Sequence, residues 1–301
     1  MSETAVAFES NGIELAGALR VPDGLKPGET RPAFIVMHGF GSTSSAGNVL
    51  QPCAILEKLG YVTLRYDQRG CGRSGGPRGH LIMQEQVADA RHALDWLAQQ
   101  PHVDAGKIGM LGSSFGAAVA IYTAGIDPRV AAVVSASGFG HGARKFRGQH
   151  KSDAEWAAFQ QMLDDGRRHR EETGESLMVD RYAIVPIPGG LRTHVLEGSI
   201  HSFTADTAQS IFDFNPEDVI GNIAPRPVLL MHSTSDSVTP VEQALGLFGK
   251  SKSPTDLFLF AETDHFMFAE HNLRVRRVLE DWLEAWFPAL GEPAPRKTGA
   301  H

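Results

Sequence analysis

Cysteine is scarce in this chain of 301 residues, because only Cys53 and Cys71 are present, too few for a disulfide framework. Long hydrophobic runs are absent, so no segment is expected to span a membrane. The first residues also lack the basic start and the apolar core of a signal peptide. We therefore expect a cytoplasmic protein in a reducing compartment, with no membrane partner.

An excess of positive charge is lacking as well, because 28 lysines and arginines stand against 35 aspartates and glutamates. The net charge of −7, without any basic patch interleaved with aromatic residues, argues against nucleic acid as a partner. Several histidines are scattered along the chain, and their spacing is not that of metal ligands: His141, His150, His194 and His201. We expect neither a metal nor a cofactor.

The chain does have the length and composition of one sizeable globular core, with 42% hydrophobic and 21% charged residues. The pair Asn11 and Gly12 separates two short strand-like runs and predicts an opening hairpin. Strand-like and helix-like segments then alternate, which predicts an α/β fold with a mostly parallel sheet and helices on both faces. The predicted strands are residues 33–37, 61–66, 107–111 and 130–135, and the predicted helices are residues 50–59, 84–99 and the segment after residue 116.

The most informative motif lies at residues 112–116, which read GSSFG and so have the form G-x-S-x-G. An apolar run precedes this motif and a run of small residues follows it. A strand, this turn and a helix in that order form the nucleophile-elbow pattern, in which a strained serine sits at the end of the strand. The flanking glycines carry no Cβ that could collide with neighbouring elements. Ser114 is therefore the predicted nucleophile.

The turn after another predicted strand is where we expect the oxyanion hole. Residues 33–37 run into residues 38–41, which read HGFG. The backbone N–H groups of Phe40 and of Phe115, the residue after the nucleophile, are the expected donors to the oxyanion. His38 itself is interpreted as structural rather than as a proton carrier.

Two later strand ends supply the remaining catalytic groups. The apolar run 227–232 is followed by Asp236, and the run 256–260 is followed by His265. Because the carboxyl ends of parallel strands share one edge of a sheet, both side chains are expected near Ser114. Where a nucleophile elbow carries the serine, the three catalytic residues follow one another along the chain as Ser, Asp, His, which is the order found here.

The chemistry requires each of these residue types. A serine hydroxyl needs a base to take its proton, and histidine titrates in the range that allows it to accept and return that proton. The carboxylate holds the imidazole in the required tautomer. Glu262 and Asp264 stay open as alternative acids, although their closeness to His265 favours a role in shaping the loop. Cys71, an alternative nucleophile, has no histidine nearby in the sequence.

These motifs resemble those of the α/β-hydrolase superfamily over residues 33–287, apart from a middle insertion. Residues 67–74 add the pattern D-x-R-G-x-G-x-S, which follows the second strand of this region. The resemblance implies that Asp67 and Arg69 brace the oxyanion turn and the nucleophile without acting as catalysts. The fold it implies is the α/β-hydrolase fold.

Within that superfamily, residues 214–218 and 223–227 resemble segments of the prolyl-oligopeptidase, X-prolyl dipeptidyl-peptidase and acyl-esterase groups. The chain contains no propeller or large additional domain, which weakens a specifically peptide-cleaving interpretation. The serine at position 114, where a dehalogenase of this fold carries aspartate, argues against dehalogenation.

The alternation of strands and helices stops between residues 138 and 212, which we interpret as an inserted helical cap. A helix is predicted to begin there at Ser152 or Asp153. Its residues Trp156, Phe159 and Met162 are expected to line the substrate pocket, to hold the cap on the core, or both. The arginines within residues 167–170 are interpreted as a solvated helix face, with a clamp for a substrate carboxylate as the alternative.

The predicted organisation is an α/β-hydrolase core of residues 1–137 and 213–290, a cap of residues 138–212 and a disordered tail of residues 291–301. The predicted function is that of a serine hydrolase, which cleaves a small or medium carboxylic ester, thioester or amide through an acyl-enzyme. Two alternatives stay open: an acyltransferase that uses the same acyl-enzyme, and a binding protein on a hydrolase scaffold. The expected partner is a small-molecule substrate, and a homo-oligomer is compatible with the sequence.

Overall fold

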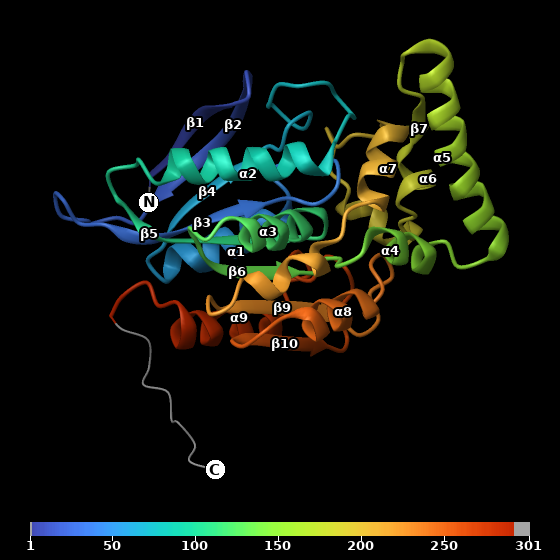
Figure 1. The fold of residues 1–301 in the computed structure, drawn as a ribbon. Helices are drawn as coiled ribbons and strands as arrows, with labels where there is room; N and C mark the ends of the chain where they lie inside the picture. Colours follow the sequence, from blue (N-terminus) through green and yellow to red (C-terminus); the bar gives the residue numbers. More distant parts are fainter. Residues whose placement is uncertain (1, 292–301) are drawn as a thin grey trace.

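The computed structural model of the protein describes residues 2–291, in which an eight-stranded sheet forms the centre (Figure 1). The strands are arranged in the order β1-β2-β4-β3-β5-β6-β9-β10. The predicted α/β-hydrolase architecture, a mostly parallel sheet with helices on both faces, is confirmed. The predicted disordered tail lies outside the described residues from residue 292 onward.

The chain opens with the predicted hairpin, in which β1 (Ser2–Ser10) pairs antiparallel with β2 (Ile13–Val21). Asn11 and Gly12 form its two-residue turn, with φ values of 49° and 77°. Asparagine and glycine tolerate such positive values, which give the turn the twist that matches the flanking strands. The hairpin joins the sheet because β2 pairs antiparallel with β4.

The remaining strands run parallel to one another, as buried apolar strands joined by helices commonly do. All their carboxyl ends therefore point toward the same edge of the sheet. These strands are β3 (Arg31–Met37), β4 (Val62–Tyr66), β5 (Val103–Ser113), β6 (Val130–Ala136), β9 (Val228–Ser233) and β10 (Thr255–Phe260).

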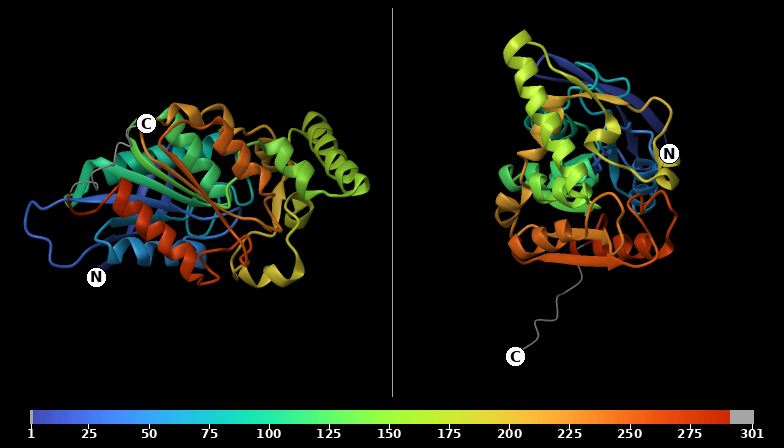
Figure 2. Two further views of the ribbon diagram at one scale, coloured as in Figure 1. Left: turned by 90° about the horizontal axis from the view of Figure 1, so that it is seen from below. Right: turned by 90° about the vertical axis from the view of Figure 1, so that its right-hand side faces the viewer.

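Helices cover both faces of this sheet (Figure 2). One face carries α2 (Met83–Leu97), α3 (Phe115–Ile126) and α8 (Glu242–Lys250), whose apolar residues share a core. The other face carries α1 (Gly47–Lys58) and α9 (Leu273–Trp286) with a second core. The buried residues of α9 recur every three to four positions, so its apolar stripe faces the sheet. They are Val275, Leu279, Trp282 and Leu283.

The segment between β6 and β9 forms a separate layer at the right-hand end of the molecule in Figure 1, beyond the carboxyl ends of the strands. It contains four α-helices, short 3₁₀ helices and a two-stranded antiparallel sheet that the sequence analysis did not predict. Its elements are α4 (Gly142–Gln149), α5 (Asp153–Thr173), β7 (Met178–Asp180), α6 (Arg181–Ile184), the 3₁₀ helix η1 (Gly189–His194), β8 (Ser202–Thr204) and α7 (Ala205–Phe212). We call residues 138–212 the cap. Two 3₁₀ turns, η2 (Pro216–Asp218) and η3 (Ile220–Asn222), lead back to β9.

The long cap helix α5 begins where its sequence predicts. The Ser152 hydroxyl accepts a hydrogen bond from the Glu155 N–H, and the Glu155 carboxylate accepts one from the Ser152 N–H. This reciprocal capping box satisfies two N–H groups that have no partner within the helix. Among residues 2–291, no helix has the length and apolarity needed to cross a membrane.

Candidate active site

Ser114 occupies the sharp turn between β5 and α3, with a φ of 56° and a ψ of −114°. A non-glycine residue adopts such a conformation only where its surroundings enforce it. The two flanking glycines make the turn sterically feasible, because a Cβ on Gly112 would lie 2.2 Å from the Gly116 carbonyl oxygen. A Cβ on Gly116 would lie 2.5 Å from the His38 carbonyl oxygen. The strand, the elbow and the helix can therefore pack closely only with glycine at both positions.

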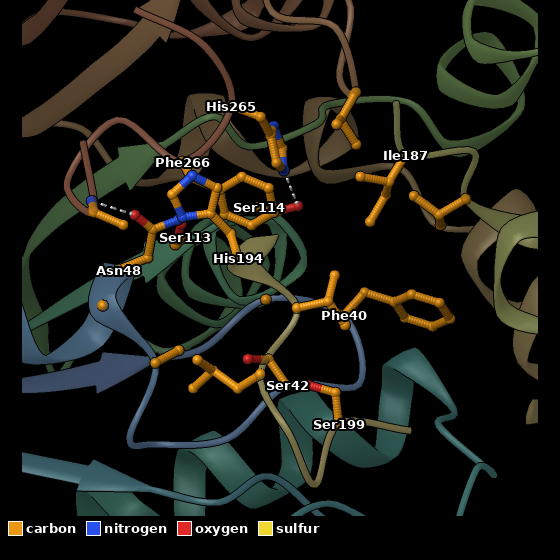
Figure 3. Close-up of a pocket in the computed structure, with 18 of the residues that line it drawn as sticks. Phe40, Ser42, Asn48, Ser113, Ser114, Ile187, His194, Ser199, His265 and Phe266 are labelled. Atoms are coloured by element: carbon orange, nitrogen blue, oxygen red, sulfur yellow. Dashed lines mark hydrogen bonds between the residues drawn. The ribbon is translucent and has the colours of Figure 1, made fainter. Parts of the chain in front are cut away.

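The structure brings Ser114, His265 and Asp236 into one hydrogen-bonded chain, although 151 residues separate the serine from the histidine. The Ser114 Oγ lies 2.9 Å from the His265 Nε2, and a dashed line joins the two side chains in Figure 3. On the other side of the ring, the His265 Nδ1 lies 2.9 Å from one Asp236 carboxylate oxygen and 3.0 Å from the other. Because an ionised carboxylate only accepts, the Nδ1–H donates to Asp236, which leaves Nε2 free to accept from the serine.

Asp264 fastens the loop that carries the acid to the loop that carries the histidine. Its carboxylate accepts hydrogen bonds from the Ser237 N–H at 2.8 Å and from the His265 N–H at 2.7 Å. It also accepts from the Ser237 hydroxyl at 2.9 Å. The expectation that Asp264 shapes this loop therefore agrees with the structure, while Asp236 is the carboxylate that contacts the imidazole.

The Asp236 carboxylate is buried, and it is held by more than the imidazole. The N–H groups of Val238 and Thr239 donate to one of its oxygens at 2.9 Å and 2.7 Å. Burial alone would raise the pKa of Asp236, but the nearby His265 and His232 and these hydrogen bonds outweigh it and lower the pKa below its ordinary value. The acid is thus kept as a carboxylate oriented toward His265.

Phe115 follows Ser114 directly in the elbow, and Phe40 lies in the turn after β3. Phe115 is the first residue of α3, so its N–H has no acceptor one turn earlier in the helix. Neither N–H group donates a hydrogen bond to another group of residues 2–291. The turn that carries Phe40 also approaches the nucleophile closely, because a Cβ on Gly39 would lie 3.5 Å from the Ser114 Cβ. Both predicted donors are thus free beside the serine.

His38 and Asp67 brace this turn, as the resemblance implied for Asp67. The His38 Nε2 accepts from the Gln68 N–H at 2.9 Å, so its Nδ1 carries the proton and donates to the Gly39 carbonyl at 2.8 Å. Asp67 accepts from the Ser44 N–H at 2.7 Å. Arg69 has a different role, because it forms an ion pair with Asp89 of α2 at 2.7 Å.

Arg181 is a site residue that the sequence analysis missed. This cap residue is only 4% exposed, and it donates to the Phe40 carbonyl at 2.6 Å and to the Ile200 carbonyl at 2.8 Å. Its guanidinium also lies 5.4 Å from the centre of the Phe40 ring. No sequence motif marked Arg181, because its partners are backbone carbonyls brought together only by the fold.

A cavity of about 200 Å³ lies over Ser114, between the sheet edge and the cap (Figure 3). The core contributes Phe40, Ser114 and the stacked ring of Phe266 to its walls. The cap contributes mainly aliphatic side chains together with His194, whose ring lies 4.9 Å from that of Phe266. Those aliphatic residues are Val185, Ile187, Val195 and Leu196. The cavity is mostly apolar, as sites for small organic molecules are.

The three aromatic and apolar residues expected in the pocket lie elsewhere in the cap. Phe159 is buried against Phe146 and His150, with ring centres 4.5 Å and 4.6 Å apart, and Trp156 stacks on Phe159 at 5.7 Å. Phe159 and Met162 line a separate surface pocket that does not include Ser114. Of the two roles expected for these residues, the structure shows the packing role, because this face of α5 is turned toward α4 and α7 and does not line the cavity over Ser114. Residues 185–196 cover the nucleophile instead.

Other candidates take structural roles in the described part of the chain. Arg167, Arg168 and Arg170 form ion pairs with aspartates at the surface, so they form the solvated face that we expected. Cys71 is fully buried, and burial raises the pKa of its thiol to about 12, which disfavours the reactive thiolate. Within residues 2–291, no group of histidine, cysteine and acidic residues is arranged to hold a metal ion.

Comparisons with known proteins agree with this geometry. A family model described as X-Pro dipeptidyl-peptidase (S15 family) matches residues 11–267. An uncharacterized 31.7 kDa protein of the traX-finO intergenic region of Escherichia coli is 27% identical over 288 residues, which cover 91% of this chain and 96% of that protein. The acyltransferase drtE of Aspergillus calidoustus is 24% identical over 245 residues, which cover 75% of this chain and 77% of that acyltransferase. The crystal structure of the alpha/beta hydrolase GrgF from Penicillium sp. sh18 matches with a TM-score of 0.77 at 21% identity, covering 94% of this chain and 98% of that one.

Proposed function

The chain belongs to the X-Pro dipeptidyl-peptidase (S15) family, and from that premise we propose that it is a serine hydrolase acting on carboxylic esters, thioesters or amides through an acyl-enzyme. The observation that carries this proposal is the continuous hydrogen-bonded chain from the Ser114 hydroxyl through His265 to Asp236. Such a chain activates a serine for attack on an acyl carbon.

The first half of the reaction transfers the acyl group to the serine. The Ser114 Oγ attacks the carbonyl carbon while its proton passes to the His265 Nε2, and the carbonyl oxygen becomes an oxyanion. The Phe40 and Phe115 N–H groups donate to that oxygen. The bond to the leaving group then breaks, and the leaving group departs with the proton from His265.

In the second half, a water molecule attacks the acyl-serine carbonyl and gives its proton to His265. The ester bond to Ser114 breaks, the serine recovers a proton from His265, and the carboxylic acid departs. Asp236 stays ionised throughout and stabilises the imidazolium that forms twice in the cycle. The mostly apolar cavity favours an uncharged, small or medium substrate in this scheme.

A fluorophosphonate probe tests the proposal directly, because it reacts only with an activated serine. Mass mapping of the folded protein is expected to find the label on Ser114, and Ser114→Ala is expected to lose both the label and ester turnover. Turnover near the wild-type rate in Ser114→Ala would refute the assigned nucleophile. Absence of label on folded wild-type protein would favour a binding protein on a hydrolase scaffold.

Acyl transfer is the second candidate, and the similarity to an acyltransferase favours it. The same acyl-enzyme would then pass its acyl group to an alcohol, thiol or amine in place of water. A mostly apolar cavity is compatible with this outcome, because it also suits an organic acceptor molecule. Product analysis with added alcohol distinguishes the two: transfer gives a new ester, whereas hydrolysis gives only the acid.

A further inference from the structure

The strand β10 forms the end of the sheet, on its lower side in Figure 1. Within residues 2–291 it pairs with β9 alone, so its other side is a free edge. The carbonyls of Pro254 and Phe260 accept hydrogen bonds from the β9 side at 3.1 Å and 2.9 Å. Because backbone groups alternate in direction along a strand, the odd-numbered residues turn theirs outward. The outward N–H and C=O groups belong to Thr255, Leu257 and Leu259.

The two edges of the sheet differ in their side chains. At the other edge, β1 exposes Glu3 and Glu9, and charged residues of this kind keep sheet edges from pairing with other molecules. The β10 edge exposes apolar side chains instead, because Phe258 is 41% exposed and Leu259 is 40% exposed. Its single charged residue is Asp256, and its register with β9 is continuous. An apolar edge of this kind is suited to pairing with a further strand.

The helix α8 extends the apolar surface beside this edge. Its Leu245 and Phe248 are 47% and 45% exposed. Gly246 faces η2, because a Cβ there would collide with the Glu217 carboxylate. Residues follow one another about every 100° around a helix, so Leu245 and Phe248 lie about 100° and 160° from Gly246. They therefore lie on the flank away from η2. Since η2 packs against α3 over the middle of the sheet, this flank borders β10.

The apolar side chains of β10 itself occupy both faces of the sheet. Leu257 packs in the core that contains Leu247 of α8, so Leu259, two residues further on, points to the α8 face. Phe260 packs in the core on the α9 face, so Phe258 points to that face. A second strand laid along this edge would therefore cover apolar groups on both faces of the sheet.

We propose that the β10 edge binds the β10 edge of a second copy of this chain, with the two strands antiparallel about a two-fold axis at Phe258. Phe258 then faces its own counterpart and Leu257 faces Leu259 of the other copy, so the outward backbone groups of both strands meet as hydrogen-bonded pairs. An axis at Leu257 would set Asp256 against the Phe258 ring. An axis at Leu259 would set Asp256 against Glu262, which carries a like charge. The axis at Phe258 avoids both conflicts.

The charges that flank β10 favour a second copy over an unrelated apolar partner. Exposed Lys250 and Lys252 precede the strand, and exposed Glu262 follows it. In an antiparallel pair, the basic start of each strand lies beside the acidic end of the other, so opposite charges meet once on each side of the axis. A single patch that complements itself is what a two-fold dimer requires.

The oligomeric state tests the proposal first. Gel filtration with light scattering is expected to give the wild-type protein twice the mass of one chain. Leu259→Lys is expected to have the mass of one chain at the same concentration, because a lysine at the edge opposes strand pairing. The control is Leu50→Lys, which replaces an exposed leucine of α1, a helix that packs on β3, β4 and β5, and it is expected to remain a dimer. Circular dichroism and urea unfolding check that each variant is folded.

A cysteine at the axis tests the register without placing a charge in the interface. In Phe258→Cys the two Cα atoms would lie about 4.5 Å apart, within reach of a disulfide, whereas in Asp256→Cys they would lie about 13 Å apart. Oxidised glutathione is therefore expected to cross-link Phe258→Cys and not Asp256→Cys, as read on a non-reducing gel. The native Cys53 and Cys71 are both free and buried, so they contribute little background.

Three results would overturn the proposal. They are a wild-type protein with the mass of one chain at every concentration measured, a dimer that persists in folded Leu259→Lys, and cross-linking of both cysteine variants or of neither. If Leu259→Lys does not fold, the two cysteine variants decide. None of these results bears on the proposed hydrolase, whose own test is the label on Ser114.

Discussion

The guanidinium of Arg181 donates a hydrogen bond of 2.6 Å to the carbonyl oxygen of Phe40, which joins the cap to the turn that carries a proposed oxyanion donor. The same side chain donates to the Ile200 carbonyl, so one buried arginine connects two cap segments with the core. The cap therefore does more than cover the cavity: it holds one wall of the reaction site in position.

Replacing Arg181 is expected to loosen the Phe40 turn. We expect Arg181→Met to lower kcat by about tenfold to hundredfold, because a misplaced oxyanion donor loses part of its stabilisation of the transition state. Steady-state kinetics and the rate of fluorophosphonate labelling measure the effect. Arg192→Met is the control, since the contacts of Arg192, a hydrogen bond to the Ile187 carbonyl and the face of the Tyr182 ring, both lie within the cap. A loss of the same size in both variants would count against this role for Arg181.

Asp236→Asn is expected to lower kcat by about 10³–10⁴-fold, because an amide does not hold the imidazole in the required tautomer. Asp264→Asn is expected to cost far less, because Asp264 contacts the Ser237 and His265 backbone and not the imidazole. Kinetics of both variants with one ester make the comparison. The assignment of the acid would be wrong if Asp264→Asn lost more activity than Asp236→Asn.

Gly116→Ala is expected to destabilise the fold by about 1–3 kcal/mol or more, because the new Cβ would meet backbone atoms that cannot move aside. The nearest would be the His38 oxygen at 2.5 Å and the Met37 oxygen at 2.7 Å. Urea unfolding measures the change. The control Gly249→Ala lies in α8 with nothing within 4 Å of the new Cβ, so it is expected to be neutral or stabilising. Equal effects of the two substitutions would contradict the packing argument.

Phe159→Ala is expected to lower the free energy of unfolding by about 3–5 kcal/mol, because it empties the centre of the aromatic cluster in the cap. Since Phe159 does not line the cavity over Ser114, the relative kcat/KM values for a series of acyl esters are expected to stay within about threefold of wild type. Ile187→Ala, which does change the cavity wall, is the comparison and is expected to alter that preference. A larger change of preference in Phe159→Ala would restore its expected role in the pocket.

The burial of Lys145 predicts a pH dependence of stability. Its pKa falls from an ordinary value of 10.5 to about 7 in the folded protein. Between these values the unfolded chain binds a proton that the folded protein does not bind, so wild type gains stability relative to Lys145→Met as pH rises. The gain is at most about 1.4 kcal/mol per pH unit. Urea unfolding of both proteins from pH 7 to pH 10 measures it, and parallel curves would show that Lys145 titrates normally.

The hairpin at Asn11 and Gly12, the elbow at Ser114 and the start of α5 at Ser152 or Asp153 could all be predicted from the sequence. Each is a local feature, in which the conformation is decided by residues within a few positions of one another. Asp236 and His265 could be selected as well, because a parallel sheet brings the carboxyl ends of its strands to one edge. The face of α5 could not be predicted, since Trp156 and Phe159 would suit a cavity wall or a cap core equally well.

The sequence by itself determined where the strands lie along the chain, that a strained serine ends one of them, and that an aspartate and a histidine follow two later ones. These features depend on short-range sterics and on periodicity. Only the tertiary structure decided which cap residues cover Ser114 and that Arg181 binds the Phe40 carbonyl. Those relationships join segments separated by many residues, and they depend on how the cap packs against the sheet edge, which no local pattern encodes.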